Sequence, residues 1–348
     1  MERLGGFWFY LFLLTVVFMT SAPSHPQTFT NPLLPGGADP QMTVFEGSYY
    51  LTYTTGSDVR VRTSRSLATL SEAEEEVVWT DTDPARCCNI WAPELHRTVG
   101  PNGPRWYVLY TAGPSECCAE QRMHVLESRA DDPLGPYTYK SRLFDPAHDF
   151  WAIDPTVLST LKGRFVVWSG TPQDNMLYEK PQYLYLAKLV NPWTLEGPRV
   201  KISEPDQAWE QVEGAVNEGP AVLQRDGKIF LAYSGSGCWT DDYAVGMLVA
   251  DAEADLLDPD SWRKLPEPLL TRSDDAQAFG PGHNAFFKSP DGSEDWLIYH
   301  ANPLSGLGCG AARSPRAQKI IWGEDGLPRL GRPVSLQTPL PLPSGEAR

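Results

Sequence analysis

The sequence predicts an all-β protein, and more specifically a five-bladed β-propeller. Five segments of the 348 residues repeat one pattern: an acid or a histidine among Pro, Gly and Ala, an apolar strand, a turn, and an aromatic strand closing on a small polar residue. The marked residues recur every 55 to 65 positions, a period that four short strands with loops would fill. They are Asp39, Glu94, Asp154, Glu218 and His283. Five such units around one axis make a propeller, whereas a β-sandwich would need five in-register hairpins by accident.

Each repeat opens with an expected β-hairpin, because dipeptides typical of tight turns separate its first two strands. In chain order these are Glu46-Gly47, Asn102-Gly103, Lys162-Gly163, Asp226-Gly227 and Asp291-Gly292. Later strands are visible in four units, at 59–62, 124–126, 183–186 and 245–249. Helix should be scarce, and its best short candidate runs from Ser71 to Val77.

The composition indicates a folded protein with a neutral partner. Charged residues make up 21% of the chain, aromatic residues 11% and hydrophobic residues 41%, a balance that disordered proteins do not have. The formal net charge of −15 repels phosphate backbones and anionic lipid surfaces. We therefore expect neither nucleic acid nor membrane as a partner.

The N-terminus has the layout of a secretory signal peptide, residues 1–22. An uncharged apolar run from Phe7 to Met19 follows Arg3, and the small residues Ser21 and Ala22 come next. The run is too short to span a bilayer, and the alternative is an N-terminal anchor or buried helix. We expect a secreted, extracellular protein whose residues 23–348 form a single propeller domain.

The propeller architecture would bring the marked residues together, because the innermost strand of every blade lines one central channel. Carboxylates gathered at one mouth raise one another's pKa, an arrangement typical of functional sites. Inverting hydrolysis of a glycosidic bond needs a carboxylic acid and a carboxylate across the sugar ring, and a third carboxylate can keep the acid protonated. Trp91 and Trp151 precede two inner strands and are candidate sugar platforms, although either could be a core residue.

Four blocks at this repeat spacing resemble the signature blocks of glycoside hydrolase family 43. They are Ala38-Asp39-Pro40, Ile153-Asp154-Pro155, Asn217-Glu218-Gly219-Pro220 and Gly280-Pro281-Gly282-His283-Asn284. The resemblance extends from about Asn31 to Pro333. It implies an inverting glycosidase in which Asp39 is the general base, Glu218 the general acid, and Asp154 the carboxylate that tunes and orients the acid.

The resemblance also implies roles for residues around these carboxyls. His283 matches a channel histidine that in many members contacts a water-coordinated cation, often calcium; a hydrogen-bonded structural histidine is the alternative. Arg316 falls where members place a channel arginine that contacts sugar hydroxyls, with a surface ion pair as the alternative. No cofactor is required. Glu94 replaces the more common Asp of its block, and we expect it to support the pocket.

Two further blocks resemble the branch of secreted exo-acting α-L-arabinofuranosidases. They are 88–96, Cys-Asn-Ile-Trp-Ala-Pro-Glu-Leu-His, and 236–239, Ser-Gly-Cys-Trp. This implies release of L-arabinose from α-1,5-linked arabinan or arabino-oligosaccharides, which are neutral plant cell-wall polymers. The alternatives are an endo-1,5-α-L-arabinanase or β-xylosidase on the same fold, a retaining fructan hydrolase whose first block this chain does not match, and a sugar-binding propeller without catalysis.

Six cysteines in an exported chain favour disulfides. Cys238 and Cys309 follow the second strands of neighbouring blades, so we expect a bridge between them. The adjacent pairs Cys87-Cys88 and Cys117-Cys118 could each close a ring or could bridge one another. A zinc site is not expected, because adjacent side chains diverge in a strand and no His lies at a zinc-finger interval.

Overall fold

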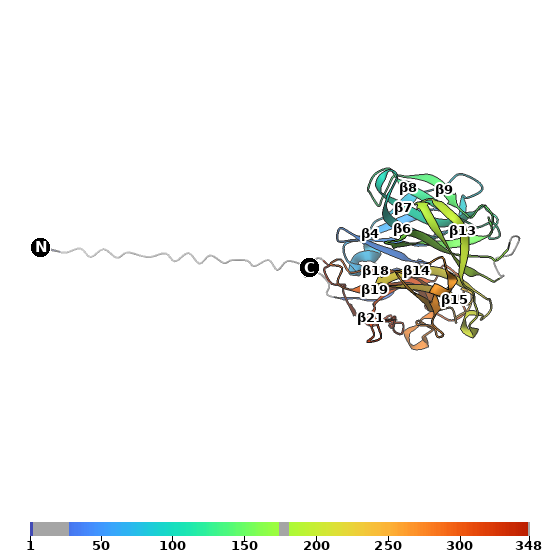
Figure 1. The fold of residues 1–348 in the computed structure, drawn as a ribbon. Coiled ribbons are helices and arrows are strands. Elements are labelled where there is room, and N and C mark those ends of the chain that lie inside the picture. Colours follow the sequence, from blue (N-terminus) through green and yellow to red (C-terminus); the bar gives the residue numbers. More distant parts are fainter. Residues whose placement is uncertain (3–27, 174–180, 347–348) are drawn as a thin grey trace.

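Five antiparallel sheets stand around a central axis in the computed structural model, which describes residues 1–2, 28–173 and 181–346 (Figure 1). Blade 1 consists of β2 (Gln41–Phe45), β3 (Ser48–Thr52), β4 (Val59–Ser64) and β5 (Glu75–Trp79). Blade 2 consists of β6 (Cys88–Gly100), β7 (Gly103–Gly113), β8 (Arg122–Ser128) and β9 (Tyr137–Leu143). Blade 3 consists of β10 (Ala152–Thr160), β11 (Gly163–Gly170), β12 (Tyr183–Asn191) and β13 (Thr194–Ser203).

The remaining two blades follow the same order. Blade 4 consists of β14 (Asn217–Arg225), β15 (Lys228–Gly235), β16 (Ala244–Asp251) and β17 (Arg263–Lys264). Blade 5 consists of β18 (Phe279–Lys288), β19 (Asp295–Asn302) and β20 (Ser314–Lys319), followed by a separate pair, β21 (Ile321–Trp322) and β22 (Pro328–Arg329). The prediction of an all-β, five-bladed propeller is confirmed.

Helix is confined to short 3-10 turns in the described residues, namely η1 (Leu67–Glu72), η2 (Ala208–Glu210), η3 (Pro259–Ser261) and η4 (Asp274–Ala276). The expected helix from Ser71 to Val77 is wrong. η1 begins after Ser66, whose side chain accepts the Ala68 N–H, and from Glu75 onward the chain pairs with β4 as β5. Within the described part of the chain, no helix has the length and apolar character needed to cross a membrane.

The innermost strand of each blade has an irregular backbone near the residue that the repeat marks. In blades 2 to 5, the register between the first and second strands shifts at this point. In every blade a residue at this point takes a left-handed conformation, with φ between 38° and 58°, and blades 2 and 5 have a second such residue three positions earlier, Asn89 and Gly280. The five residues at this point are Asp39, Ala92, Asp154, Gly219 and His283. A bulge bends a strand and re-aims its side chains, and the proline that follows four of the five has no N–H to leave unpaired.

A polar side chain from the preceding blade caps the N–H group that most of these bulges release. Thr54 Oγ1 accepts from Ala92 at 2.8 Å, Thr111 Oγ1 from Asp154 at 3.0 Å, Ser234 Oγ from His283 at 2.7 Å, and His300 Nδ1 from Asp39 at 3.0 Å. The capping residues are the polar residues on which the aromatic second strands of the repeat close. An unpaired buried N–H costs about 1–3 kcal/mol, so the repeated polar residue stabilises the contact between neighbouring blades at four of the five junctions.

Glu94 does not lie with the other four marked residues at the channel mouth. The left-handed residue of blade 2 is Ala92, so Glu94 lies two positions further along β6 and faces the other end of the channel. There it lines a second cavity of about 460 Å³, with its Oε2 2.7 Å from His96 Nε2. Glu94 therefore does not line the catalytic pocket, although its charge still acts on Asp154 and His283.

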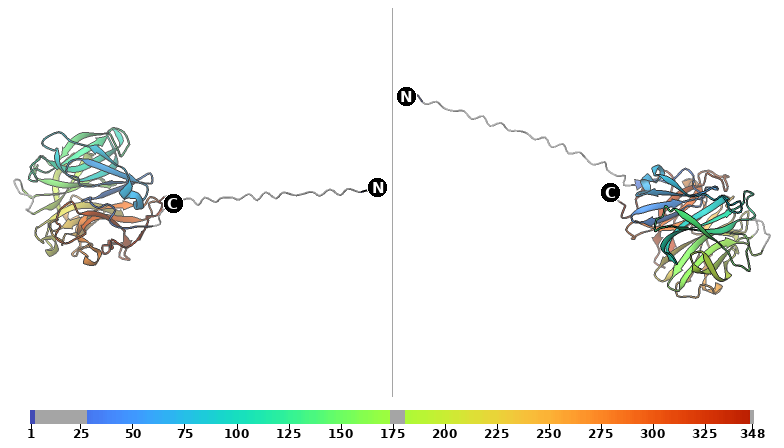
Figure 2. Two further views of the ribbon diagram at one scale, coloured as in Figure 1. Left: turned by 180° about the vertical axis from the view of Figure 1, so that it is seen from behind. Right: turned by 90° about the horizontal axis from the view of Figure 1, so that it is seen from above.

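The ring closes between blades 5 and 1, which lie side by side in Figures 1 and 2. An apolar cluster that joins Phe29 and Leu33 to Tyr49 of blade 1 and Trp296 of blade 5 fills this junction. β1 (Thr28–Phe29) pairs with β23 (Leu340–Pro341), so both ends of the described propeller lie at the same seam. The buried Glu346 completes it, because its Oε1 accepts the Tyr49 hydroxyl at 2.8 Å.

The six cysteines form three disulfides. Cys238 and Cys309 are bridged with their Cα atoms 5.4 Å apart, as predicted from their places after β15 and β19. Cys87 pairs with Cys88, and Cys117 pairs with Cys118. Of the two arrangements left open by the sequence, the structure has the adjacent pairings.

Candidate active site

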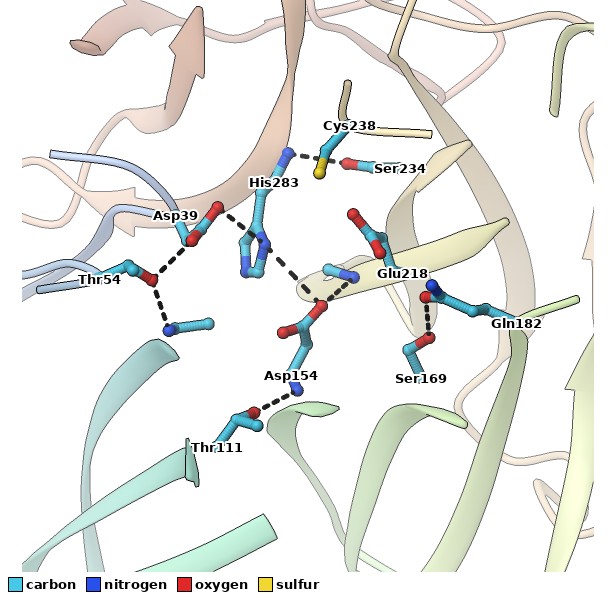
Figure 3. Close-up of polar contacts among 12 residues, drawn as sticks. Asp39, Thr54, Thr111, Asp154, Ser169, Gln182, Glu218, Ser234, Cys238 and His283 are labelled. Carbon is cyan, nitrogen blue, oxygen red and sulfur yellow. Dashed lines mark hydrogen bonds and ion pairs between the residues drawn. The ribbon is translucent and has the colours of Figure 1, made fainter. Parts of the chain in front are cut away.

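A pocket of about 260 Å³ lies at the channel mouth where the inner strands begin, and residues from all five blades line it. Figure 3 shows Asp39, Asp154, Glu218 and His283 facing one another across this mouth. The bulges explain this convergence. Asp39 and Asp154 occupy left-handed positions, and Glu218 directly precedes the left-handed Gly219.

Asp39 is held as a carboxylate. Its Oδ1 accepts from Arg313 at 2.9 Å, and its Oδ2 accepts from Thr54 Oγ1 at 2.6 Å. Burial opposes ionisation, but Arg313, His283 and His300 outweigh it and hold the pKa of Asp39 well below its usual range. The Nδ1 of His300 already accepts the Asp39 N–H, and burial lowers the pKa of His300 to about 4. Arg313 is therefore the partner of Asp39 that is charged at neutral pH.

Glu218, in contrast to Asp39, favours the protonated form. Burial and the negative charge of Asp39 raise its pKa to about 7, although a hydrogen bond from Tyr243 opposes the shift. The Tyr243 hydroxyl donates to Glu218 Oε1 at 2.8 Å, and the tyrosine ring stacks parallel to the imidazole of His300. Glu218 is thus protonated in a large fraction of molecules at neutral pH. Because Tyr243 occupies Oε1, the proton belongs on Oε2.

Asp154 stands between the other two carboxyls. Burial, Glu218 and Asp39 together raise its pKa well above the usual range. Its Oδ2 accepts the Gly219 N–H at 3.1 Å, a bond to the residue directly after Glu218. Asp154 and Glu218 interact strongly, so they titrate as a pair rather than as independent groups. The contact with Gly219 gives Asp154 a direct hold on the backbone that carries Glu218.

His283 lies at the centre of the carboxyl group cluster. Its Nδ1 is 3.4 Å from Asp39 Oδ1 and 3.9 Å from Asp154 Oδ2. Burial lowers its pKa, so the ring is neutral at neutral pH. In the described ranges, no three His, Cys, Asp or Glu side chains form a group that could hold a metal ion. Calcium needs six to eight oxygen ligands, so these side chains do not fit a direct calcium cage.

Trp91 and Trp151, the predicted platforms, both line the pocket. Trp91 is half-buried, whereas Trp151 is only 4% exposed and donates its indole N–H to the Cys118 carbonyl at 2.9 Å. Trp151 is therefore part of the wall, with its orientation fixed by the loop that carries the Cys117–Cys118 disulfide. Trp91 keeps more of its surface free for a ligand.

The prediction that Arg316 contacts sugar in the channel is wrong. Its side chain is fully buried in β20 and donates to the carbonyls of Ala276 and Gln277. Arg313 takes the expected place, because it precedes β20 at the end of the blade where the pocket opens. Arg316 lies in the middle of β20, where side chains pack between blades, whereas Arg313 lies just before the strand and reaches the pocket.

Several residues around the pocket escaped the sequence reasoning. Thr54 and His300 are the polar residues that close two aromatic strands, so the repeat already contained a signal for them. Tyr243 and Arg313 lie in or beside irregular loops and had no repeat position to mark them. Trp239 belongs to the block 236–239 that carries the resemblance, but the sequence did not indicate that it lines the pocket.

The arrangement can carry out acid–base chemistry on a small neutral ligand. One buried carboxyl is kept ionised and another is kept largely protonated in the same pocket. This division of protonation states between two carboxyls is the requirement for hydrolysing a glycosidic bond with one acid and one base.

Comparisons with known proteins agree with this geometry. Residues 29–328 match the model of glycosyl hydrolases family 43. The chain is 39% identical over 326 residues to a protein of Streptomyces avermitilis named extracellular exo-α-(1→5)-L-arabinofuranosidase; the match covers 90% of this chain and 66% of that protein. It is 38% identical over 295 residues to a protein of the same name from Streptomyces chartreusis, covering 83% of this chain and 87% of that one.

A solved structure gives the same result at the level of the fold. The crystal structure of an α-L-arabinofuranosidase from Lactobacillus brevis superimposes with a TM-score of 0.81 and 32% sequence identity, covering 89% of this chain and 98% of that one. The chain spans about two thirds of the length of the S. avermitilis relative, so the match does not extend over that whole protein. The family model, the relatives and the propeller agree, and the chain belongs to glycosyl hydrolase family 43.

Proposed function

We propose that this protein is an exo-acting, inverting α-L-arabinofuranosidase that releases L-arabinose from α-1,5-linked arabinan or arabino-oligosaccharides. The observation that carries the proposal is the opposite protonation of Asp39 and Glu218 within one pocket. The names of two Streptomyces relatives support the choice of an arabinofuranosyl substrate.

The proposed reaction is a single displacement. Glu218 donates its proton to the departing glycosidic oxygen while Asp39 removes a proton from the water that attacks the anomeric carbon. Asp154 accepts the Gly219 N–H directly after the acid and so orients the backbone that carries Glu218. Arg313 and Thr54 keep Asp39 ionised and fix its two oxygens.

Exo action follows from the size and the walls of the pocket. Its volume of about 260 Å³ is suited to one or two sugar rings rather than to a continuous polymer. Cys118 and the Cys238–Cys309 disulfide contribute to the rim, so loops held by covalent links bound the space in which the chain end would sit. A chain end can enter such a pocket, whereas an internal segment needs an open groove.

The setting of the enzyme is part of the same proposal. The layout of residues 1–22 favours export by a signal peptide, although all but the first two of these residues lie outside the described ranges. The extracellular names of the relatives support secretion, and the net charge of −15 favours a neutral polysaccharide over nucleic acid or membrane. A cation near His283 would be held through waters, and the acid–base chemistry does not require it, so activity should survive dialysis against a chelator.

The test is a time course with purified mature protein and linear α-1,5-arabinan, followed by chromatography and by NMR of the anomeric proton. Arabinose as the sole early product, first appearing with inverted configuration, is the expected result. A ladder of oligosaccharides would refute exo action, and retained configuration would refute the single displacement. Absence of product from arabinan and arabino-oligosaccharides would overturn the substrate assignment.

A further inference from the structure

We propose that Trp239 is the platform of a leaving-group subsite, on which the second arabinofuranosyl ring of the substrate stacks. The proposal rests on the proposed function and extends it, because it assigns the part of the site that binds what remains after arabinose is released. Trp239 lines the pocket and is half-buried.

The position of Trp239 relative to the acid identifies the subsite. Glu218 pairs with Ser234 on β15, and the loop that leaves β15 carries first Trp239 and then Tyr243, which bonds to Glu218. Cys238 and Trp239 line the same pocket as Glu218, and Figure 3 shows Cys238 near Ser234 at its edge. A general acid protonates the oxygen of the leaving group, so the surface next to the acid on the same blade is where that group sits.

The ring of Trp239 is held in one orientation by its neighbours. A Cβ atom on Gly237 would lie 2.3 Å from the indole, and one on Gly214 would lie 2.9 Å from it, so the ring packs directly on backbone. Its N–H donates to the Glu213 carbonyl at 2.9 Å. The Cys238–Cys309 disulfide ties the same loop to blade 5. An indole fixed in this way loses little conformational freedom when a ligand stacks on it.

The chemistry of the fixed ring fits a neutral sugar. An indole face is electron-rich and apolar, and a furanose ring offers C–H groups that pack on such a face. The loop that follows Asn302 lies beside Trp239, because a Cβ atom on Gly308 would be 3.5 Å from the Trp239 carbonyl oxygen, and Cys309 of the same loop lines the pocket. The platform is therefore part of the pocket wall that blades 4 and 5 share.

The experiment compares two substrates that differ only in the leaving group. The leaving group of methyl α-L-arabinofuranoside is methanol, which has no ring to stack on Trp239. The leaving group of α-1,5-L-arabinotriose is a disaccharide, whose first ring would stack there. Trp239→Ala is expected to lower kcat/KM for arabinotriose about tenfold, mainly through KM, and to change the methyl glycoside by less than about twofold. Gly237→Ala, which displaces the indole without removing it, should give the same selective loss.

The control is Trp322→Ala on β21, because this tryptophan is also half-buried and also has its N–H bonded, to Asp295 Oδ2 at 3.0 Å, but lies outside the pocket. Trp322→Ala should leave the ratio of kcat/KM for the two substrates unchanged. An equal loss on both substrates in Trp239→Ala, or no loss on either, would overturn the subsite. If the wild-type protein cleaves neither substrate, the proposed function itself fails, and this outcome is visible before any variant is compared.

Discussion

Replacing Tyr243 by Phe would test whether Glu218 is the proton donor. The change removes one oxygen and keeps the aromatic ring that stacks on His300. It deletes the hydrogen bond of 2.8 Å from the phenol to Glu218 Oε1, which favours the ionised carboxylate. Both side chains are buried, so water does not readily replace the lost donor.

The magnitude follows from the strength of that bond. Burial and the charge of Asp39 raise the pKa of Glu218 to about 7 while the phenol opposes them. A hydrogen bond to a charged group is worth about 1.5–3 kcal/mol, and 1.36 kcal/mol corresponds to one pKa unit. Losing the phenol should therefore raise the pKa of Glu218 by about one unit or more. Since the acid must be protonated to act, activity is lost as pH rises through this pKa.

The assay is the pH dependence of kcat/KM on arabinotriose. In the wild-type protein the basic limb should fall near pH 7, and in Tyr243→Phe it should move upward by about one unit, with a lower kcat because a weaker acid donates its proton less readily. The matched control is Tyr233→Phe, which removes an equally buried phenol from Glu210 at 2.7 Å, outside the pocket. An unmoved basic limb in Tyr243→Phe, or the same displacement in Tyr233→Phe, would refute the reasoning.

Three further predictions concern the two catalytic carboxyls, the charge partner of the base, and the junction between blades 5 and 1. Glu218→Gln and Asp39→Asn should each abolish hydrolysis with an unchanged melting temperature, checked by product release and calorimetry; wild-type turnover by either would exclude the assigned role. Arg313→Met removes the cation beside Asp39, so the pKa of Asp39 should rise. Because the base must be ionised to act, the acidic limb of kcat/KM against pH should move to higher pH; an acidic limb at the wild-type pH would contradict this. Glu346→Ala leaves the buried Tyr49 hydroxyl and the Leu67 N–H without their acceptor and should cost about 1–3 kcal/mol of unfolding free energy in denaturant titrations, with kcat unaffected.

The repeat made most of the fold predictable from sequence. An aromatic strand that closes on Thr54, Thr111 or Ser234 recurs because that polar residue must cap the bulge of the following blade. The Asp-Pro motifs recur because proline suits a break in the strand ladder. Asp39 and Asp154 could be placed in the channel because both signals coincide there. A structural requirement that recurs in every blade therefore appears as a repeated sequence motif.

The other residues of the site do not belong to a repeated motif. Arg313 and Arg316 are three residues apart, and only the point at which β20 begins decides which one reaches the pocket. Tyr243 and Trp239 belong to a loop whose course depends on glycine contacts and on a disulfide between two blades. Glu94 was misplaced because the bulge of blade 2 falls on Ala92, a residue without a functional group to attract notice. Such details are set by tertiary contacts rather than by local pattern.

The capping residue between blades 5 and 1 also connects the two catalytic carboxyls. Three bulges are capped by short hydroxyl side chains, but the bulge at Asp39 is capped by His300, whose larger ring reaches across from blade 5. By accepting the Asp39 N–H, Nδ1 fixes the neutral tautomer with its proton on Nε2. The same ring offers its face to Tyr243, which holds Glu218. His300 therefore contacts both the base, through the Asp39 N–H, and the tyrosine that bonds to the acid. A substitution at His300 should move both limbs of the pH profile of kcat/KM, and a profile with either limb unmoved would contradict this connection.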